Sequence, residues 1–203
     1  MAKFRGKYRI ESIRAQWWNY GWNGTYFITI CTKNRNHYFG EITNRKMVFS
    51  SLGIIADILW HEIPNHSKFV SLGEFVVMPN HIHGILLIDK PDNPTDKGHA
   101  PGVDTGHAPG VVDTGHAPGV VDTGHALYLP GKTLFQNIGK NTISSIVGSY
   151  KSAVTRHANR LEIENGWQAG FHDHIIRNHA EYNRIENYII KNPQNWNDDK
   201  FNN

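Results

Sequence analysis

The sequence predicts an α+β fold in which helices pack on one face of an antiparallel sheet. Segments rich in β-branched and aromatic residues alternate with segments of helical apolar spacing, in the order strand, helix, strand, strand, helix, strand, helix. Two of the strands are separated by three residues, a step too short for anything but a tight hairpin or a bulge. At 203 residues the chain is long enough for one well-buried core.

Four segments are expected to be the main strands of this sheet. Residues 25–32 are β-branched and aromatic throughout, which is typical of a central strand. Residues 69–77 and 81–88 lie on either side of the Met-Pro-Asn step, and residues 171–176 supply the last strand. A further short strand is expected at 47–49.

Three segments are expected to be helices. Ser51 is placed to cap a helix that runs to His61, and residues 142–156 carry an apolar stripe with a basic back. The last helix has the strongest local signals. Asn178 is an N-cap residue, Glu181 lies three positions on as in a capping box, and Pro193 ends the helix.

The chain is expected to form a single domain over residues 1–203, with an insertion at 90–131. The insertion contains copies of the unit Gly-His-Ala-Pro-Gly-Val-Val-Asp-Thr. Each unit has a Pro-Gly turn and little to bury, so the segment cannot form a core. We interpret it as a flexible low-complexity loop that has expanded by repetition. A weak metal-binding array, formed by the regularly spaced histidines, is the alternative.

Composition excludes several classes of protein. No apolar run approaches the roughly 20 residues that a membrane span needs. The basic N-terminal segment is not followed by an apolar signal core, so we expect a cytoplasmic protein without a membrane partner. The single cysteine, Cys31, rules out an internal disulfide, suits a reducing compartment and is expected in the core.

Positive charge is concentrated in two parts of a chain whose net charge is only +3. Residues 1–14 hold five Lys or Arg against one acid, and residues 132–160 hold five against none. A phosphate-backbone partner needs such stretches, although a solvated helix face and a frayed terminus explain them equally well. The candidate DNA-binding residues are Lys7, Arg9, Arg14, Lys33, Arg35, Lys151, Arg156 and His174.

Two histidines, His81 and His83, stand at the start of the third expected strand. Successive side chains of a strand point to opposite faces, so both imidazoles lie on one face. Their attachment points are then roughly 6–7 Å apart, close enough to bind one metal ion. A second pair with the same spacing, His172 and His174, is an alternative on spacing alone.

The last helix offers the partners that the histidine pair lacks. Tyr188 and Asn192 are four residues apart and therefore share a helix face. Two imidazoles and an amide oxygen leave a metal with open positions for phosphate oxygens, and the polarised phosphate is then open to attack by Tyr188. Because the free pKa of tyrosine is about 10, a nearby cation is required. Tyr150 is a second candidate nucleophile, but it lies within the apolar stripe and has no amide four residues on.

These residues resemble those of a known family. The run Val-Met-Pro-Asn-His-Ile-His-Gly at 77–84 is similar to the His-hydrophobic-His (HUH) motif of single-strand tyrosine transposases. Trp-Gln at 167–168, residues 171–177 and Tyr-Ile-Ile-Lys-Asn-Pro at 188–193 resemble the C-terminal signature of their REP-associated branch. The resemblance covers most of the chain outside 90–131.

The resemblance implies a ferredoxin-like (RRM-like) core that binds a divalent metal, Mg²⁺ or Mn²⁺, through His81, His83 and Asn192. Related transposases carry glutamine where Asn192 stands. Imidazoles by themselves favour softer ions such as Zn²⁺, and phosphate oxygens that complete the shell would ease this conflict.

The family's reaction implies a role for Tyr188 and a class of substrate. Tyr188 would form a 5′-phosphotyrosine link and leave a free 3′-hydroxyl on single-stranded DNA beside an imperfect hairpin, in a monomer or a homodimer. Two other functions stay open. The chain could be a domesticated, catalytically silent protein that binds DNA hairpins, or an RNA-binding module whose sheet aromatics stack on bases.

Overall fold

The computed structural model describes residues 3–4, 7–8, 20–91 and 141–202. Arg9, Arg14 and most of the expected insertion at 90–131 lie outside the described residues, and of Lys7 only the backbone is described. The strands are β1 (Lys3–Phe4), β2 (Lys7–Tyr8), β3 (Gly24–Cys31), β4 (Gly40–Thr43), β5 (Lys46–Phe49), β6 (Val70–Met78), β7 (His81–Ile88) and β8 (His172–Ile176). The helices are η1 (Lys33–Arg35), α1 (Ser51–His61), α2 (Ile63–His66), α3 (Ile143–Arg160), α4 (His179–Lys191) and η2 (Asn192–Asp198).

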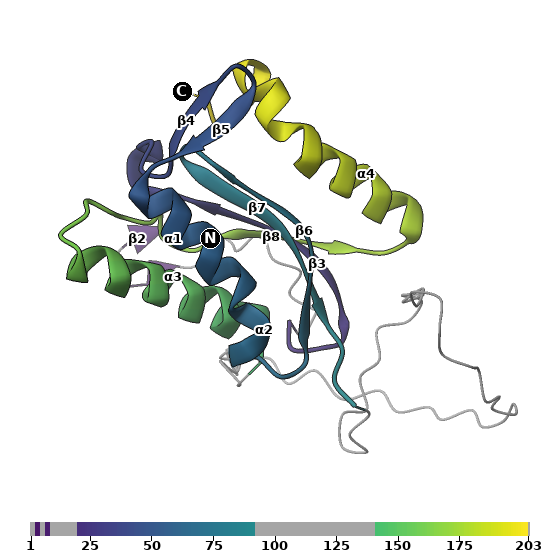
Figure 1. Ribbon diagram of the computed structural model, residues 1–203. Coiled ribbons are helices and arrows are strands. Elements are labelled where there is room, and N and C mark those ends of the chain that lie inside the picture. Colours follow the sequence, from purple (N-terminus) through teal and green to yellow (C-terminus); the bar gives the residue numbers. More distant parts are fainter. Residues whose placement is uncertain (1–2, 5–6, 9–19, 92–140, 203) are drawn as a thin grey trace, which may run out of the picture.

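A four-stranded sheet organises the domain, with the strand order β6, β7, β3, β8 (Figure 1). Each neighbouring pair is antiparallel, and β6 and β7 form the expected hairpin. The predicted α+β class is confirmed, and the four main strands begin and end within one residue of the expected positions. The short strand expected at 47–49 is β5, which pairs with β4, a strand that the sequence analysis missed.

The three expected helices are present, and local capping explains where they begin. The side chain of Ser50, not Ser51, accepts a hydrogen bond from the Gly53 N–H at the start of α1. Thr142 and Ser145 form a capping box at the start of α3. Asn178 caps α4 as predicted, through a 2.8 Å bond from the backbone N–H of Glu181.

Helices α1 and α3 cover one face of the sheet and form the larger core with it (Figure 1). Trp60 of α1 is fully buried, stacks on Phe75 and meets Tyr150 of α3 edge to face. The Tyr150 hydroxyl donates a 2.8 Å hydrogen bond to the carbonyl of Ala56 and so ties the two helices together. Tyr150 is therefore a core residue, and the prediction that core packing is its main role is confirmed.

Helix α4 lies on the opposite face of the sheet, where Ile185 and Ile189 pack on Ile85 of β7 and Ile176 of β8 (Figure 1). The expectation that the helices share one face holds for α1 and α3 and does not extend to α4. The physical reason is that β7 is apolar at both odd and even positions, so each face of the sheet needs a cover. The face of the sheet that α4 covers carries the odd-numbered residues of β7, including His81 and His83, so α4 lies beside the two histidines.

The chain ends on the same side as the two histidines. After α4, η2 leads into residues 199–202, and the carbonyl of Phe201 accepts a 2.7 Å hydrogen bond from Nδ2 of Asn80. Trp196 of η2 stacks on the ring of His81, with 6.1 Å between centroids. Among the described helices, none combines the length and apolar character that a membrane crossing requires.

Close packing at Gly84 leads to a test of this arrangement. A Cβ atom at Gly84 would overlap Cζ2 of the buried Trp60, so Gly84→Ala should lower the free energy of unfolding by about 2–3 kcal/mol. Gly148→Ala is the matched control, because a Cβ atom at this position of α3 would have nothing within 4 Å. This variant should raise the free energy of unfolding by about 0.5–1 kcal/mol, since alanine favours a helix more than glycine does. Urea unfolding measures both, and equal effects would contradict the packing.

Candidate metal centre and nucleophile

The two histidines of β7 are buried, with His81 0% and His83 1% exposed, and their ring centroids lie 4.5 Å apart. Each imidazole is held through Nδ1. Nδ1 of His83 lies 2.9 Å from Oγ1 of Thr29, its partner on β3, and Nδ1 of His81 lies 2.9 Å from Oδ1 of Asn80. An amide oxygen only accepts, so Nδ1 of His81 carries the hydrogen and Nε2 keeps a free lone pair. Such fixing of the ring through one nitrogen is usual for metal-binding histidines.

Two ligand-type atoms in this region have no hydrogen-bond partner among the described residues. They are Nε2 of His81 and Oδ1 of Asn192, and both are buried. Leaving a buried polar atom unsatisfied costs about 1–3 kcal/mol, and a bound cation would remove that cost. The two atoms belong to residues that the sequence predicted to be metal ligands.

A carboxylate that the sequence analysis did not single out completes the group. Asp199, His81 and His83 each offer an atom within 4.8 Å of the others and could together hold a metal ion. The Asp199 carboxylate accepts a 3.0 Å hydrogen bond from Nδ2 of Asn192 and a 2.7 Å bond from the N–H of Phe201. The first bond turns the amide so that Oδ1 of Asn192 is left for another partner.

Burial keeps both imidazoles in the form that binds metals. Desolvation lowers the pKa of His81 to about 4, although the negative charge of Asp199 opposes this shift. Desolvation also lowers the pKa of His83 well below its usual value, and the neighbouring His81 adds to the effect. Both rings are therefore neutral at pH 7 and have lone pairs to give to a cation.

Tyr188 of α4 lies at this site. Its hydroxyl is 3.2 Å from Nε2 of His83, and its ring meets Phe27 edge to face with 6.3 Å between centroids. The side chain is 41% exposed, so a substrate can reach it. Burial and the charge of Asp199 raise the pKa of Tyr188, while hydrogen bonding from the side-chain amide N–H of Asn192 lowers it. The phenol is thus protonated at neutral pH unless a cation is added nearby.

A cleft of about 1270 Å³ opens in front of Tyr188. Its walls come from β3, β8, α4, the loop before β8 and the C-terminal segment. Its charged lining residues are Arg35, Asp173, Arg184, Asp198, Asp199 and Lys200. The two histidines of β8 and the amide of Gln168 also line it, so the approach to Tyr188 is polar.

Four of the other five candidate DNA-binding residues fall into two groups, and Lys33 belongs to neither. Arg35 and His174 line this cleft, and Arg35 also donates a 2.8 Å hydrogen bond to the carbonyl of Lys200. Lys151 and Arg156 lie in a separate groove on α3, where Nζ of Lys151 donates to two backbone carbonyls of the 168–170 loop. Lys33 is exposed and is not part of either cavity.

Two further expectations can be compared with the structure. Cys31 was expected in the core, but it is half-buried and lines the cleft. The alternative histidine pair, His172 and His174, lies at the edge of the sheet on β8 and has no third metal-ligand side chain grouped with it among the described residues. The pair on β7 is the one that has such a partner.

Asp199 was missed because no local signal marks it. It follows the Asn-Pro step that ends α4, in a segment without strand or helical periodicity, and only the path of η2 returns it to the histidines. An acid seven residues after Asn192 was the sole available sign. Arg184 was missed for a similar reason, since one arginine on a helix has no pattern of its own.

Comparisons with known proteins give one close relative and a weaker structural likeness. No family model matches the chain. An uncharacterized protein of Haemophilus influenzae is 35% identical over 197 residues, which cover 97% of this chain and 94% of that protein. A REP-associated tyrosine transposase, solved with a bound REP hairpin, is similar with a TM-score of 0.49 and 16% identity, over 97% of this chain and 74% of that one. Because its TM-score is below 0.5, the likeness to this transposase is not used to infer the chemistry of the site.

Metal binding at this site is open to a direct test by thermal unfolding. A ligand at about 100 times its Kd stabilises a protein by roughly 2.7 kcal/mol, so Mn²⁺ should raise the Tm of the wild type clearly. His81→Ala should remove most of this response, and Asp199→Asn should weaken the apparent affinity for Mn²⁺ at least about tenfold. His172→Ala, which removes an exposed histidine of the same sheet, is the control and should respond like the wild type. An unchanged response in His81→Ala would exclude this site.

Proposed function

The chain belongs to the same family as the Haemophilus influenzae protein, and we propose that it is a metal-dependent enzyme that cleaves and rejoins single-stranded DNA through Tyr188. The resemblance of residues 77–84 and 188–193 to HUH tyrosine transposases supports this reaction class. The proposed substrate is a DNA strand beside a hairpin. The segment 90–131 is proposed to be a passive insertion.

One observation carries the proposal. The hydroxyl of Tyr188 lies 3.2 Å from Nε2 of His83, next to a buried group in which two ligand-type atoms, Nε2 of His81 and Oδ1 of Asn192, have no hydrogen-bond partner among the described residues. A core tyrosine would not need such neighbours. An exposed phenol beside unsatisfied metal-ligand atoms is the arrangement that phosphoryl transfer by tyrosine requires.

The reaction is a transfer of one phosphoryl group. Oη of Tyr188 attacks the phosphorus, the new O–P bond forms, and the bond to the 3′-oxygen breaks. The phenol loses its proton and the departing oxygen gains one, so a free 3′-hydroxyl remains. Rejoining is the same exchange in reverse, with a 3′-hydroxyl as the nucleophile. A divalent cation held by the site supplies Lewis-acid polarisation of the phosphoryl oxygens and the positive charge that favours the phenolate.

The set of donor atoms bears on the identity of the metal. His81 and His83 provide two nitrogens, which alone would favour Zn²⁺. Asp199 and Asn192 add a carboxylate and an amide oxygen, and oxygen ligands suit Mg²⁺ and Mn²⁺. The carboxylate therefore shifts the site toward the harder ions, and Mn²⁺, which accepts both ligand types, is the proposed cofactor to test first.

The central test is the covalent intermediate. Incubation of the protein with a labelled hairpin oligonucleotide and Mn²⁺ should yield a protein–DNA adduct that survives a denaturing gel. Tyr188→Phe should abolish it, with a loss of at least about 10³-fold, because no other group replaces the nucleophile. Tyr182→Phe is the matched control on the same helix, since Tyr182 packs against the smaller core beneath α4 and does not line the cleft.

Two results would contradict the proposal. An adduct in Tyr188→Phe would assign the nucleophile elsewhere. A wild type that binds the hairpin but never forms an adduct would favour the catalytically silent hairpin-binding protein.

The position of Tyr188 also predicts that one chain contains a complete site. Tyr188 and His83 are in hydrogen-bond contact within the same chain, so we expect catalysis in cis. In a mixture of the Tyr188→Phe protein and the His81→Ala protein, DNA cleavage should not exceed the background level that each variant shows alone. A site assembled from two chains would instead regain a large fraction of wild-type cleavage in the mixture.

A further inference from the structure

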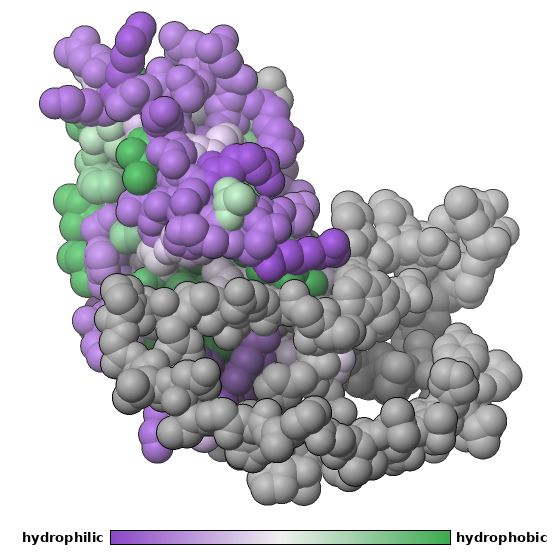
Figure 2. Space-filling model, turned by 90° about the vertical axis from the view of Figure 1, so that its right-hand side faces the viewer, coloured by the Kyte–Doolittle hydropathy of each residue, from purple (hydrophilic) through white to green (hydrophobic). Residues whose placement is uncertain are grey.

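A cluster of charged residues at the start of α4 is not used by the chemistry described so far. Glu181, Arg184, Tyr188 and Asn192 recur at three- to four-residue spacing and therefore share one face of the helix. Arg184 lies one turn before Tyr188, about 6 Å along the helix axis. Seen from the right of Figure 1, the upper part of the molecule, where α4 lies, is largely hydrophilic (Figure 2).

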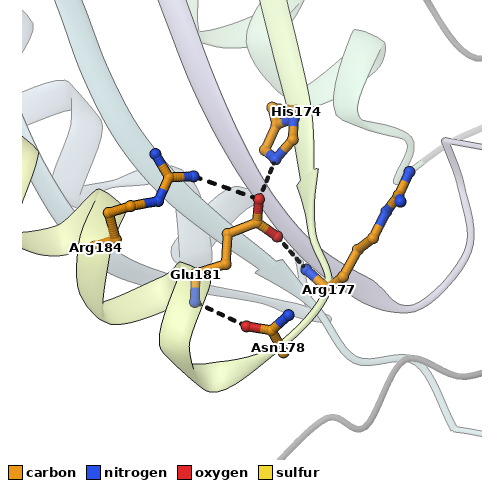
Figure 3. Close-up of polar contacts among 5 residues, drawn as sticks. All are labelled: His174, Arg177, Asn178, Glu181 and Arg184. Atoms are coloured by element: carbon orange, nitrogen blue, oxygen red, sulfur yellow. Dashed lines mark hydrogen bonds and ion pairs between the residues drawn. The ribbon is translucent and has the colours of Figure 1, made fainter.

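Glu181 holds this cluster together (Figure 3). One carboxylate oxygen lies 2.8 Å from Nε2 of His174 and 3.6 Å from Nη2 of Arg184. The other accepts a 2.9 Å hydrogen bond from the backbone N–H of Arg177. Although burial alone would raise the pKa of Glu181, these hydrogen bonds and the charge of Arg184 lower it, so the carboxylate is charged at neutral pH.

The exposures of the three side chains differ in a way that suggests a role. The Glu181 side chain is 19% exposed, whereas those of His174 and Arg184 are 43% and 73% exposed. His174 and Arg184 line the cleft and Glu181 does not. Glu181 therefore sits behind two groups that face the space in front of Tyr188.

The contact with Glu181 also orients the ring of His174. A carboxylate only accepts, so Nε2 of His174 carries a hydrogen and donates it to Glu181, and the second nitrogen, Nδ1, can donate to an anion when it also carries a hydrogen. His174 pairs with Phe27 on β3, and the ring of Phe27 contacts that of Tyr188. His174 and Tyr188 are thus both neighbours of Phe27, His174 through strand pairing and Tyr188 through a ring contact.

We propose that His174 and Arg184, held in place by Glu181, bind a backbone phosphate of the DNA strand one nucleotide away from the phosphate that Tyr188 attacks. This inference rests on the proposed function for its substrate class. Arg184 supplies planar charged donors, and the imidazolium form of His174 supplies an Nδ1–H donor, both suited to a phosphate. Glu181 is a positioning residue, because it touches the two ligands and not the phosphate.

The test measures binding rather than cleavage, in the full chain carrying Tyr188→Phe. The probe is a hairpin oligonucleotide with a single-stranded tail, in which one linkage at a time is replaced by an uncharged methylphosphonate. Replacement at one linkage should weaken binding about tenfold, since a charge-assisted contact is lost. When the protein also carries Arg184→Ala or His174→Ala, binding of the unmodified probe should be weaker. The methylphosphonate at the same linkage should then change the affinity by about twofold or less.

Two further variants separate positioning from general electrostatics. Arg177→Ala removes the same charge as Arg184→Ala, but its side chain points away from Glu181 and it does not line the cleft, so the methylphosphonate effect should persist (Figure 3). Glu181→Gln removes a negative charge and should tighten binding if only net charge matters. The proposal instead expects Glu181→Gln to weaken binding, and the methylphosphonate effect at that one linkage to be several-fold smaller than in the parent protein.

The outcomes are distinct from those of the adduct test. A methylphosphonate effect of equal size in the Arg184→Ala, His174→Ala and parent proteins at every linkage would overturn the phosphate site, and so would an absence of any binding. An effect that depends on Arg184 and His174 would support the site even if the wild type formed no adduct. In that case the phosphate contact would belong to a hairpin-binding protein, and only the proposed catalysis would fail.

Discussion

The position of β7 between β3 and β6 is the constraint on which the rest of the site depends. Because both edges of β7 are paired and both faces are covered, His81 and His83 are almost fully buried. Burying two imidazoles is costly unless each polar atom has a partner. Thr29 and Asn80 satisfy the Nδ1 atoms, and the Nε2 atoms are directed toward Tyr188 and the metal-ligand group. Burial thus selects the neutral form of the rings and orients them.

The two faces of the sheet carry separate tasks. The face under α1 and α3 holds the larger core, in which Trp60 packs so closely on Gly84 that no side chain fits there. The opposite face has only the small cluster beneath α4, and the remainder of that face is given to the cleft. Stability therefore depends mainly on one side of the sheet, which leaves the other side free to carry buried polar groups at a cost.

Features with a local cause could be predicted from the sequence. The strands, the shared face of His81 and His83, and the cap at Asn178 follow from two-residue alternation, helical spacing and capping chemistry. The face that α4 covers, the β4 strand and the arrival of Asp199 depend on tertiary packing and on the path of η2. No window of sequence contains that information. Arg184 could be recognised as a candidate phosphate ligand only from its contact with Glu181, which also holds His174.

The C-terminal segment contributes both a candidate metal ligand, Asp199, and an aromatic ring, Phe201, that covers the two histidines. Asp199 belongs to the metal-ligand group, and two residues later the ring of Phe201 packs on His81 and His83, with centroid distances of 4.5 and 5.8 Å. The N–H of Phe201 donates to the Asp199 carboxylate itself. The aromatic cover and the carboxylate are therefore parts of one turn. A movement of Phe201 that uncovers the imidazoles therefore also displaces the Asp199 carboxylate, so access to the histidines is coupled to the geometry of the candidate metal-ligand group.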